Sequence, residues 1–160
     1  FPSSSNSVNQ DFCTSANGNH NDLEVNILPL NMAKSGFDVN YKVTFKNKGT
    51  TIQSGTISLN FNDAILDLIS ASPIVTNQSL NSLTWSFSNL LPFESREINL
   101  TLNLNSPTEI PAVNLGDILS YGITINGFID EIPNDNSAIL NQIVVNSFDP
   151  NRSKNGSFCG

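Results

Sequence analysis

Ile98-Asn99-Leu100-Thr101-Leu102-Asn103-Leu104 is the stretch that decides the fold. Apolar and polar residues alternate through it with a period of two, which is typical of a β-strand with one buried and one solvated face. No window of the chain offers a convincing apolar stripe at helical spacing. The stretch therefore predicts a strand.

The alternation recurs between short turns rich in Asn, Gly, Asp and Pro. Further strands are predicted in residues 23–27, 39–45, 57–61, 83–87, 119–125 and 139–145, and the more apolar run 65–71 is either one buried strand or two short pieces. Strands at such regular spacing indicate an all-β fold, an antiparallel immunoglobulin-like β-sandwich of about seven to nine strands.

Composition supports this class and excludes others. Charged residues make up only 13% of the chain, and Asn, Ser and Thr supply most of the polarity, which suits strands and turns better than helices. The formal net charge of −7, without a cluster of Lys or Arg, argues against nucleic-acid binding. No apolar run approaches the ~20 residues that a transmembrane helix needs, so no transmembrane segment is expected.

Residues 1–10 are polar and are predicted to be a linker or disordered leader, and residues 11–160 are predicted to be a single domain. Cys13 and Cys159 are the only cysteines. Because domain termini often lie close together, we predict a disulfide between them that closes the domain; the alternative is two reduced thiols. A disulfide implies an oxidising compartment, and hence an extracellular or outer cell-surface location.

Catalytic motifs are absent from the sequence: it holds no GxSxG, no HExxH and no glycine-rich phosphate loop. His20, the single histidine, lies in a polar turn and is predicted to be solvated. We therefore predict that the protein is not an enzyme. Asp130, Asp135 and Asn136 lie in one acidic turn and are candidate metal ligands, because Ca²⁺ prefers such oxygen donors. The alternative, which we favour, is that this turn only caps its own backbone.

Alternation also predicts which side chains face the core. The expected core is Tyr41, Val43, Phe45, Leu59, Phe61, Trp85, Phe87, Leu100, Leu102, Tyr121, Ile123, Ile139 and Val144. Trp85 belongs to this set rather than to a sugar-binding platform. Phe37, Phe93 and Phe128 fall outside clear strands and are the candidates for an exposed aromatic patch.

Several segments resemble a domain of large secreted proteins from Bacteroidetes, especially flavobacteria. They are Asp11-Phe12-Cys13, His20 to Val25, Gly36-Phe37-Asp38 through Tyr41, Tyr-x-Val-x-Phe-x-Asn-x-Gly-Thr at 41–50, Leu83-Thr84-Trp85-Ser86-Phe87, Pro133-Asn134-Asp135-Asn136 and Asn146 to Asn151 before Cys159. More loosely, the chain is similar to the conserved-repeat and CARDB-like bacterial immunoglobulin-fold domains. One departure is that residues 152–158 replace the Asp-Lys that usually follows Asp-Pro-Asn in the family, which puts any role of that acidic position in doubt.

The resemblance implies export, as in substrates of the type IX secretion system, and a stalk or adhesion role without a catalytic site. We therefore expect a non-catalytic structural or interaction module of a secreted or cell-surface bacterial protein. Its partners would be neighbouring domains of a larger protein, or a protein or glycan at the surface. The alternative is a carbohydrate-binding module, with Ca²⁺ assisting at the Asp130–Asn136 turn.

Overall fold

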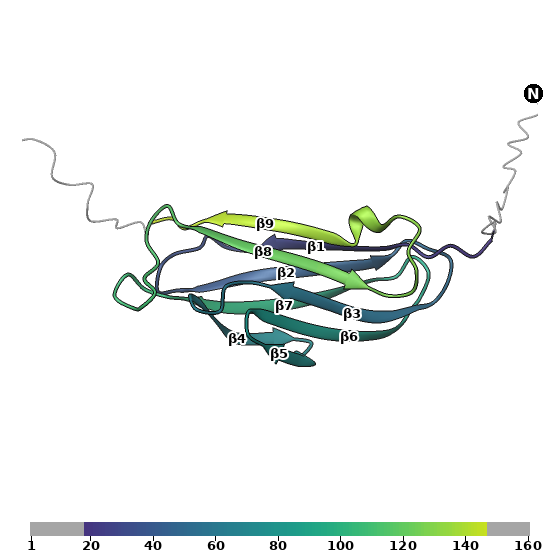
Figure 1. Ribbon diagram of the computed structural model, residues 1–160, viewed down its shortest axis with the longest axis horizontal. Helices are drawn as coiled ribbons and strands as arrows, with labels where there is room; N and C mark the ends of the chain where they lie inside the picture. Colours follow the sequence, from purple (N-terminus) through teal and green to yellow (C-terminus); the bar gives the residue numbers. More distant parts are fainter. Residues whose placement is uncertain (1–17, 147–160) are drawn as a thin grey trace, which may run out of the picture.

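The computed structural model describes residues 18–146, and these residues form two antiparallel β-sheets packed face to face (Figure 1). The nine strands are β1 (Leu23–Pro29), β2 (Asp38–Asn47), β3 (Gln53–Asn60), β4 (Leu66–Ser72), β5 (Asn77–Ser79), β6 (Ser82–Leu90), β7 (Ser95–Leu104), β8 (Ile118–Asn126) and β9 (Ser137–Ile143), with one short 3-10 turn, η1 (Pro133–Asp135). One sheet has the order β1-β2-β7-β4 and the other β5-β6-β3-β8-β9. The prediction of an all-β sandwich is confirmed.

The core lies between the sheets and is built by the inward residues of the alternating strands. Leu100 and Leu102 of β7 are almost fully buried, as are Val43 of β2 and Ile123 of β8. Trp85 is only 2% exposed, and its indole N–H donates to the carbonyl oxygen of Pro73 at 3.0 Å. Trp85 is therefore a core residue, as predicted, and its ring is not available as a sugar platform.

For one residue, the prediction that it lies in the core was wrong. Ile139 is 80% exposed on the outer face of β9, whereas Ala138, Leu140 and Gln142 face inward. Residues 138–140 are all apolar, so this segment carries no alternation that would fix which side is buried. Val144 is buried as expected, but it lies beyond the end of β9.

The described chain enters the sandwich at one end and leaves it at the other. The carbonyl oxygen of Gly18 accepts a hydrogen bond from Thr50, in the β2–β3 loop, while the N–H of Val145 donates to Ala33, in the β1–β2 loop. These two loops lie at opposite ends of β2 (Figure 1). The expectation that the two ends of the domain lie close together is thus not met by residues 18 and 146.

We call the end near Gly18 the entry end; it comprises residues 18–22, 48–52, 91–94 and 127–136. The end near residue 146 is called the exit end and comprises residues 30–37, 105–117 and 144–146. Cys13, Cys159 and the predicted leader 1–10 lie outside the described residues, so the predicted disulfide stays a prediction. Within residues 18–146 no helix has the length and apolarity to span a bilayer.

Candidate functional site

The loops of the entry end are joined to one another by hydrogen bonds. Asn47 is completely buried, and its amide nitrogen donates to the carbonyl oxygens of Thr51 at 2.7 Å and Leu90 at 3.0 Å. The backbone N–H of Glu131 donates to Asn21 at 3.0 Å, which ties the β8–β9 loop to the entering chain. Four loops therefore form one connected surface, because each is bonded to a neighbour rather than only to water.

A charged cluster occupies one side of this surface. The Lys48 ammonium lies 2.6 Å from Asp135, 3.8 Å from Glu24 and 3.9 Å from Asp22. The hydrogen bond with Asp135 raises the pKa of Lys48, so the ammonium stays charged. Burial raises the pKa of Asp22, and Lys48 opposes that rise. Lys48 is thus the positive charge that this group of carboxylates shares.

The predicted metal ligands lie in or next to this cluster. Both carboxylate oxygens of Asp130 accept backbone N–H groups at 2.7 Å, one from Leu23 and one from Ile132. Asp130 therefore caps backbone, as the alternative interpretation of the turn expects. Asp135 pairs with Lys48 through one oxygen.

Three oxygens of the cluster are buried without a hydrogen-bond partner: Oδ1 of Asp22, Oδ1 of Asp135 and Oδ1 of Asn136. Such oxygens are chemically suited to Ca²⁺. However, no group of three or more His, Cys, Asp or Glu side chains within residues 18–146 has an arrangement that would hold a metal ion. Sequence reasoning named Asp130, Asp135 and Asn136 but missed Asp22 and Lys48, since neither belongs to the acidic turn.

His20 lies at the rim of the entry end. Its Nδ1 is 2.9 Å from Oε2 of Glu131, and about half of each side chain is exposed. The prediction placed His20 in a polar turn, and the structure adds that the turn is joined to the β8–β9 loop, more than a hundred residues away in sequence.

The exposed aromatic residues lie at the ends of the sandwich. Phe37, Phe93 and Phe128 are 57%, 65% and 65% exposed, and the other six aromatic residues of the described chain are buried. Phe93 and Phe128 lie at the entry end, whereas Phe37 lies at the exit end. The three residues named from the sequence are therefore exposed as expected, but they do not form one patch.

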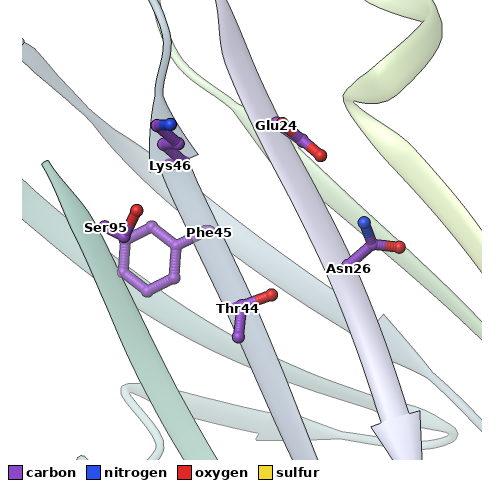
Figure 2. A pocket seen from close by; sticks show the side chains of 6 residues that line it. All are labelled: Glu24, Asn26, Thr44, Phe45, Lys46 and Ser95. Atoms are coloured by element: carbon purple, nitrogen blue, oxygen red, sulfur yellow. The ribbon is translucent and has the colours of Figure 1, made fainter. Parts of the chain in front are cut away.

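The outer face of the β1-β2-β7-β4 sheet is polar. One hollow on this face, of about 140 Å³, is lined by Glu24, Asn26, Thr44, Phe45, Lys46 and Ser95 (Figure 2). Phe45 is 5% exposed, because its ring packs inward against Phe87 at 5.4 Å between centroids. Among residues 18–146, this face therefore presents mainly amide, hydroxyl and charged groups, and no exposed aromatic ring on which a sugar would stack.

The fold of this chain has counterparts among solved structures. No family model matches the sequence, and no curated protein matches it. Among solved structures, the CARDB domain of the PF1109 protein from Pyrococcus furiosus, crystallised in complex with di-metal ions, has a TM-score of 0.57 at 18% identity. The match covers 82% of this chain and 100% of that domain.

Two further structures are similar at lower scores. The solution structure of the same Pyrococcus furiosus domain has a TM-score of 0.49 at 16% identity, covering 79% of this chain and 96% of that one. A chain of a complex between CaDoc0917 and CaCohA2 also has a TM-score of 0.49, at 13% identity, covering 71% of this chain and 94% of that one. At these identities the comparison shows the fold alone. That fold is the immunoglobulin-like β-sandwich of CARDB-type domains.

Proposed function

We propose that this domain is a non-catalytic structural and interaction module, a stalk or adhesion unit of a secreted or cell-surface bacterial protein. The observation that carries the proposal is that the described chain enters at one end of the sandwich and leaves at the other. With Cys13 and Cys159 unbridged, a module connected in this way spaces the units before and after it, since its own length separates them; a bridge between the two cysteines would instead join the chain on either side of the domain.

The distribution of apolar residues supports contacts at the two ends. The entry end exposes Ile52, Leu91, Phe93, Phe128, Ile129 and Ile132, and the exit end exposes Leu30, Met32, Phe37, Ile110 and Leu115, each by half or more. Clustered exposed apolar residues are typical of interaction sites. The ends are therefore the surfaces that would meet neighbouring domains or a partner at the cell surface.

Strand geometry suits a unit that bears tension. β1 and β9 both run from the entry end toward the exit end, and they pack against each other (Figure 1). A force applied to residues 18 and 146 pulls β1 and β9 in opposite directions along their axes. Seven residue pairs join β1 to β2 and seven join β8 to β9, and the force loads each set in parallel.

Single-molecule force spectroscopy tests the stalk role. The chain would be pulled through its two termini, and in a second variant through its N-terminus and a cysteine replacing Ile52, with Cys13 and Cys159 changed to Ser in both. The second variant is loaded only at the entry end, so β1 peels from β2 one pair at a time. We expect a severalfold higher unfolding force through the two termini. Equal forces in the two geometries would contradict the stalk role.

Export by a type IX system and an origin in Bacteroidetes belong to the same proposal and rest on the sequence resemblance described above. Secretome analysis of the source bacterium, with and without a functional type IX system, is the direct measurement. Loss of the protein from the medium and cell surface when the system is inactive is the expected result.

Carbohydrate binding assisted by Ca²⁺ is the second candidate. The observation in its favour is the set of three unpartnered oxygens on Asp22, Asp135 and Asn136, and a CARDB domain of similar fold was crystallised with metal ions. Affinity electrophoresis through gels containing bacterial and plant polysaccharides, with Ca²⁺ and with a chelator, separates the two candidates. Retardation that depends on Ca²⁺ would favour this second function.

A further inference from the structure

Phe93 has a backbone conformation that its residue type disfavours. Six residues within 18–146 have positive φ: Gly18, Gly36 and Gly116, then Asn81 and Asn89, and finally Phe93 at +63°. Glycine has no Cβ and asparagine tolerates the left-handed region, so five of the six are of the expected types. A bulky aromatic residue there is an outlier.

The turn around Phe93 explains which residue the backbone would prefer. The N–H of Glu94 donates to the carbonyl oxygen of Leu91 at 3.0 Å, which closes a β-turn with Pro92 and Phe93 at its centre. Proline second and a positive φ third define a type II turn, and its third position strongly favours glycine. The local structure alone would therefore select glycine at position 93.

This turn is also held rigidly. Arg96 donates to Glu94 at 2.7 Å and to the carbonyl oxygens of Ser88 at 2.9 Å and Asn89 at 2.8 Å. The second oxygen of Glu94 accepts the N–H of Leu91 at 2.7 Å. The guanidinium and carboxylate thus fix both sides of the turn, and the direction of the Cα–Cβ bond of Phe93 is fixed with it.

Burial of the Phe93 ring does not compensate for the strain. Phe93 is 65% exposed and Leu91 beside it is 51% exposed, so the ring gains little from burial in the folded domain. Strained residues that persist against local preference concentrate at functional sites. Exposed aromatic residues are also frequent anchors of protein interfaces, and a backbone that is already fixed loses little conformational freedom on binding.

We propose that Phe93 is the anchor through which the entry end binds an apolar pocket with a basic rim on a partner protein. The basic rim follows from the charges around Phe93. Six acidic residues lie at or beside this end: Asp22, Glu24, Glu94, Asp130, Glu131 and Asp135. The Lys and Arg residues there are Lys46, Lys48 and Arg96, and the last two are already paired with acids. Acidic groups therefore outnumber them. A partner whose pocket is surrounded by Lys or Arg complements this excess of negative charge.

The inference depends on the proposed function only in assuming that the entry end meets another protein. The test uses phage-displayed random 12-residue peptides selected on the full chain. Selected peptides would then be synthesised and titrated against the wild type and Phe93→Gly by calorimetry. We expect them to combine apolar residues with Lys or Arg, and to bind Phe93→Gly at least tenfold more weakly. Glycine suits the turn, so Phe93→Gly should melt at the wild-type temperature or above it.

Matched variants make the result specific. Phe37→Ser removes a similarly exposed ring from the opposite end and should leave peptide affinity unchanged. Arg96→Ala keeps the ring but releases the turn, and should weaken binding severalfold. Failure to select any peptide, or equal binding to Phe93→Gly, overturns the anchor role. A lower melting temperature for Phe93→Gly also overturns it, because Phe93 would then be structural. None of these results bears on the pulling experiment, so the stalk proposal fails or stands separately.

Discussion

Tyr41 and Tyr121 come from opposite sheets and share a hydrogen bond of 2.6 Å between their hydroxyl oxygens in the buried core. The Tyr41 hydroxyl donates onward to Oε1 of Gln142 at 2.7 Å. Tyr121 therefore donates to Tyr41, and the chain of hydrogen bonds runs from β8 through β2 to β9. It satisfies polar groups that would otherwise be buried without partners, and it links the two sheets directly.

The two tyrosines should differ in the cost of losing their hydroxyl. Tyr121→Phe removes one donor and leaves the Tyr41–Gln142 bond intact, so we expect a loss of about 1 kcal/mol in the free energy of unfolding. Tyr41→Phe leaves both the Tyr121 hydroxyl and the Gln142 carbonyl oxygen without this partner, so about 2–3 kcal/mol is expected. Urea denaturation followed by Trp85 fluorescence measures both values. Equal losses of unfolding free energy in the two variants would contradict a chain of hydrogen bonds in which Tyr121 donates to Tyr41 and Tyr41 donates to Gln142.

Alkaline pH should unfold the domain through the same pair. Burial raises the pKa of Tyr41 to about 12, and burial also raises the pKa of Tyr121. In the unfolded chain tyrosine ionises near its ordinary value of about 10, so above that pH the unfolded state loses protons that the folded state keeps. Stability is then constant below about pH 10 and falls above it, by about 1.4 kcal/mol per pH unit for each buried tyrosine. Denaturation curves between pH 8 and about 11.5 test the slope, and Tyr121→Phe should reduce it.

Replacing Lys48 should destabilise the domain at neutral pH, because the carboxylates of the acidic cluster then repel one another. Lys48→Met leaves Asp22, Glu24 and Asp135 without their shared cation, so the pKa of Asp22 should rise further. A carboxylate with a raised folded-state pKa destabilises the fold fully above that pKa, and the penalty is lost progressively as the pH falls from that pKa to the unfolded-state value. We therefore expect Lys48→Met to lower the melting temperature at pH 7, and the difference from wild type to shrink near about pH 4.

Calcium distinguishes the two interpretations of this cluster. If Lys48 supplies the positive charge, millimolar Ca²⁺ should leave the melting temperature of the wild type unchanged and should raise that of Lys48→Met, because the vacated oxygens then bind the ion. Mg²⁺ at equal concentration is the control for ionic strength. An increase in the wild type with Ca²⁺ alone would show that the cluster binds metal despite Lys48.

Alanine substitutions at two glycines in neighbouring strands should have opposite effects on the stability of the domain. A Cβ at Gly55 would lie 1.8 Å from the carbonyl oxygen of Asn126, so the backbones of β3 and β8 would have to separate. We expect Gly55→Ala to cost about 3 kcal/mol. A Cβ at Gly122 meets nothing within 4 Å, so Gly122→Ala should be neutral or stabilising by about 0.5–1 kcal/mol. Thermal denaturation of the two variants side by side checks both signs.

The disulfide prediction concerns residues outside those described, and intact mass decides it. If Cys13 and Cys159 are bridged, alkylation of the denatured protein should add mass only after reduction. Gel filtration of the unreduced protein separates a bridge within one chain from a bridge between two copies. Free labelling without reduction would remove the argument for an oxidising compartment.

Sequence reasoning succeeded where alternation was clear. The residues predicted for strands in β1, β2, β3, β6, β7 and β8 fall in these strands to within a residue or so, because each strand has one buried face and one solvated face. It failed where alternation was absent. β5, with only Asn77, Gln78 and Ser79, has no apolar residue that would have signalled it, and the side of Ile139 was ambiguous.

The candidate site was only partly predictable. The acidic turn and the exposed phenylalanines carry local signals: a cluster of oxygen donors, and aromatic residues outside the strands. The pairing of Lys48 with Asp135 joins residues 87 positions apart. No local pattern encodes such a contact, because it depends on where two loops meet.

The sequence by itself determined the class of fold, most strand positions and the burial of all but one of the residues named for the core. The period of two and the exclusion of apolar side chains from water are local properties of the chain. The tertiary structure alone decided which strands are neighbours, which loops share an end, and that residues 18 and 146 leave from opposite ends. These features depend on distances between residues far apart in sequence, and such distances exist only once the two sheets have packed.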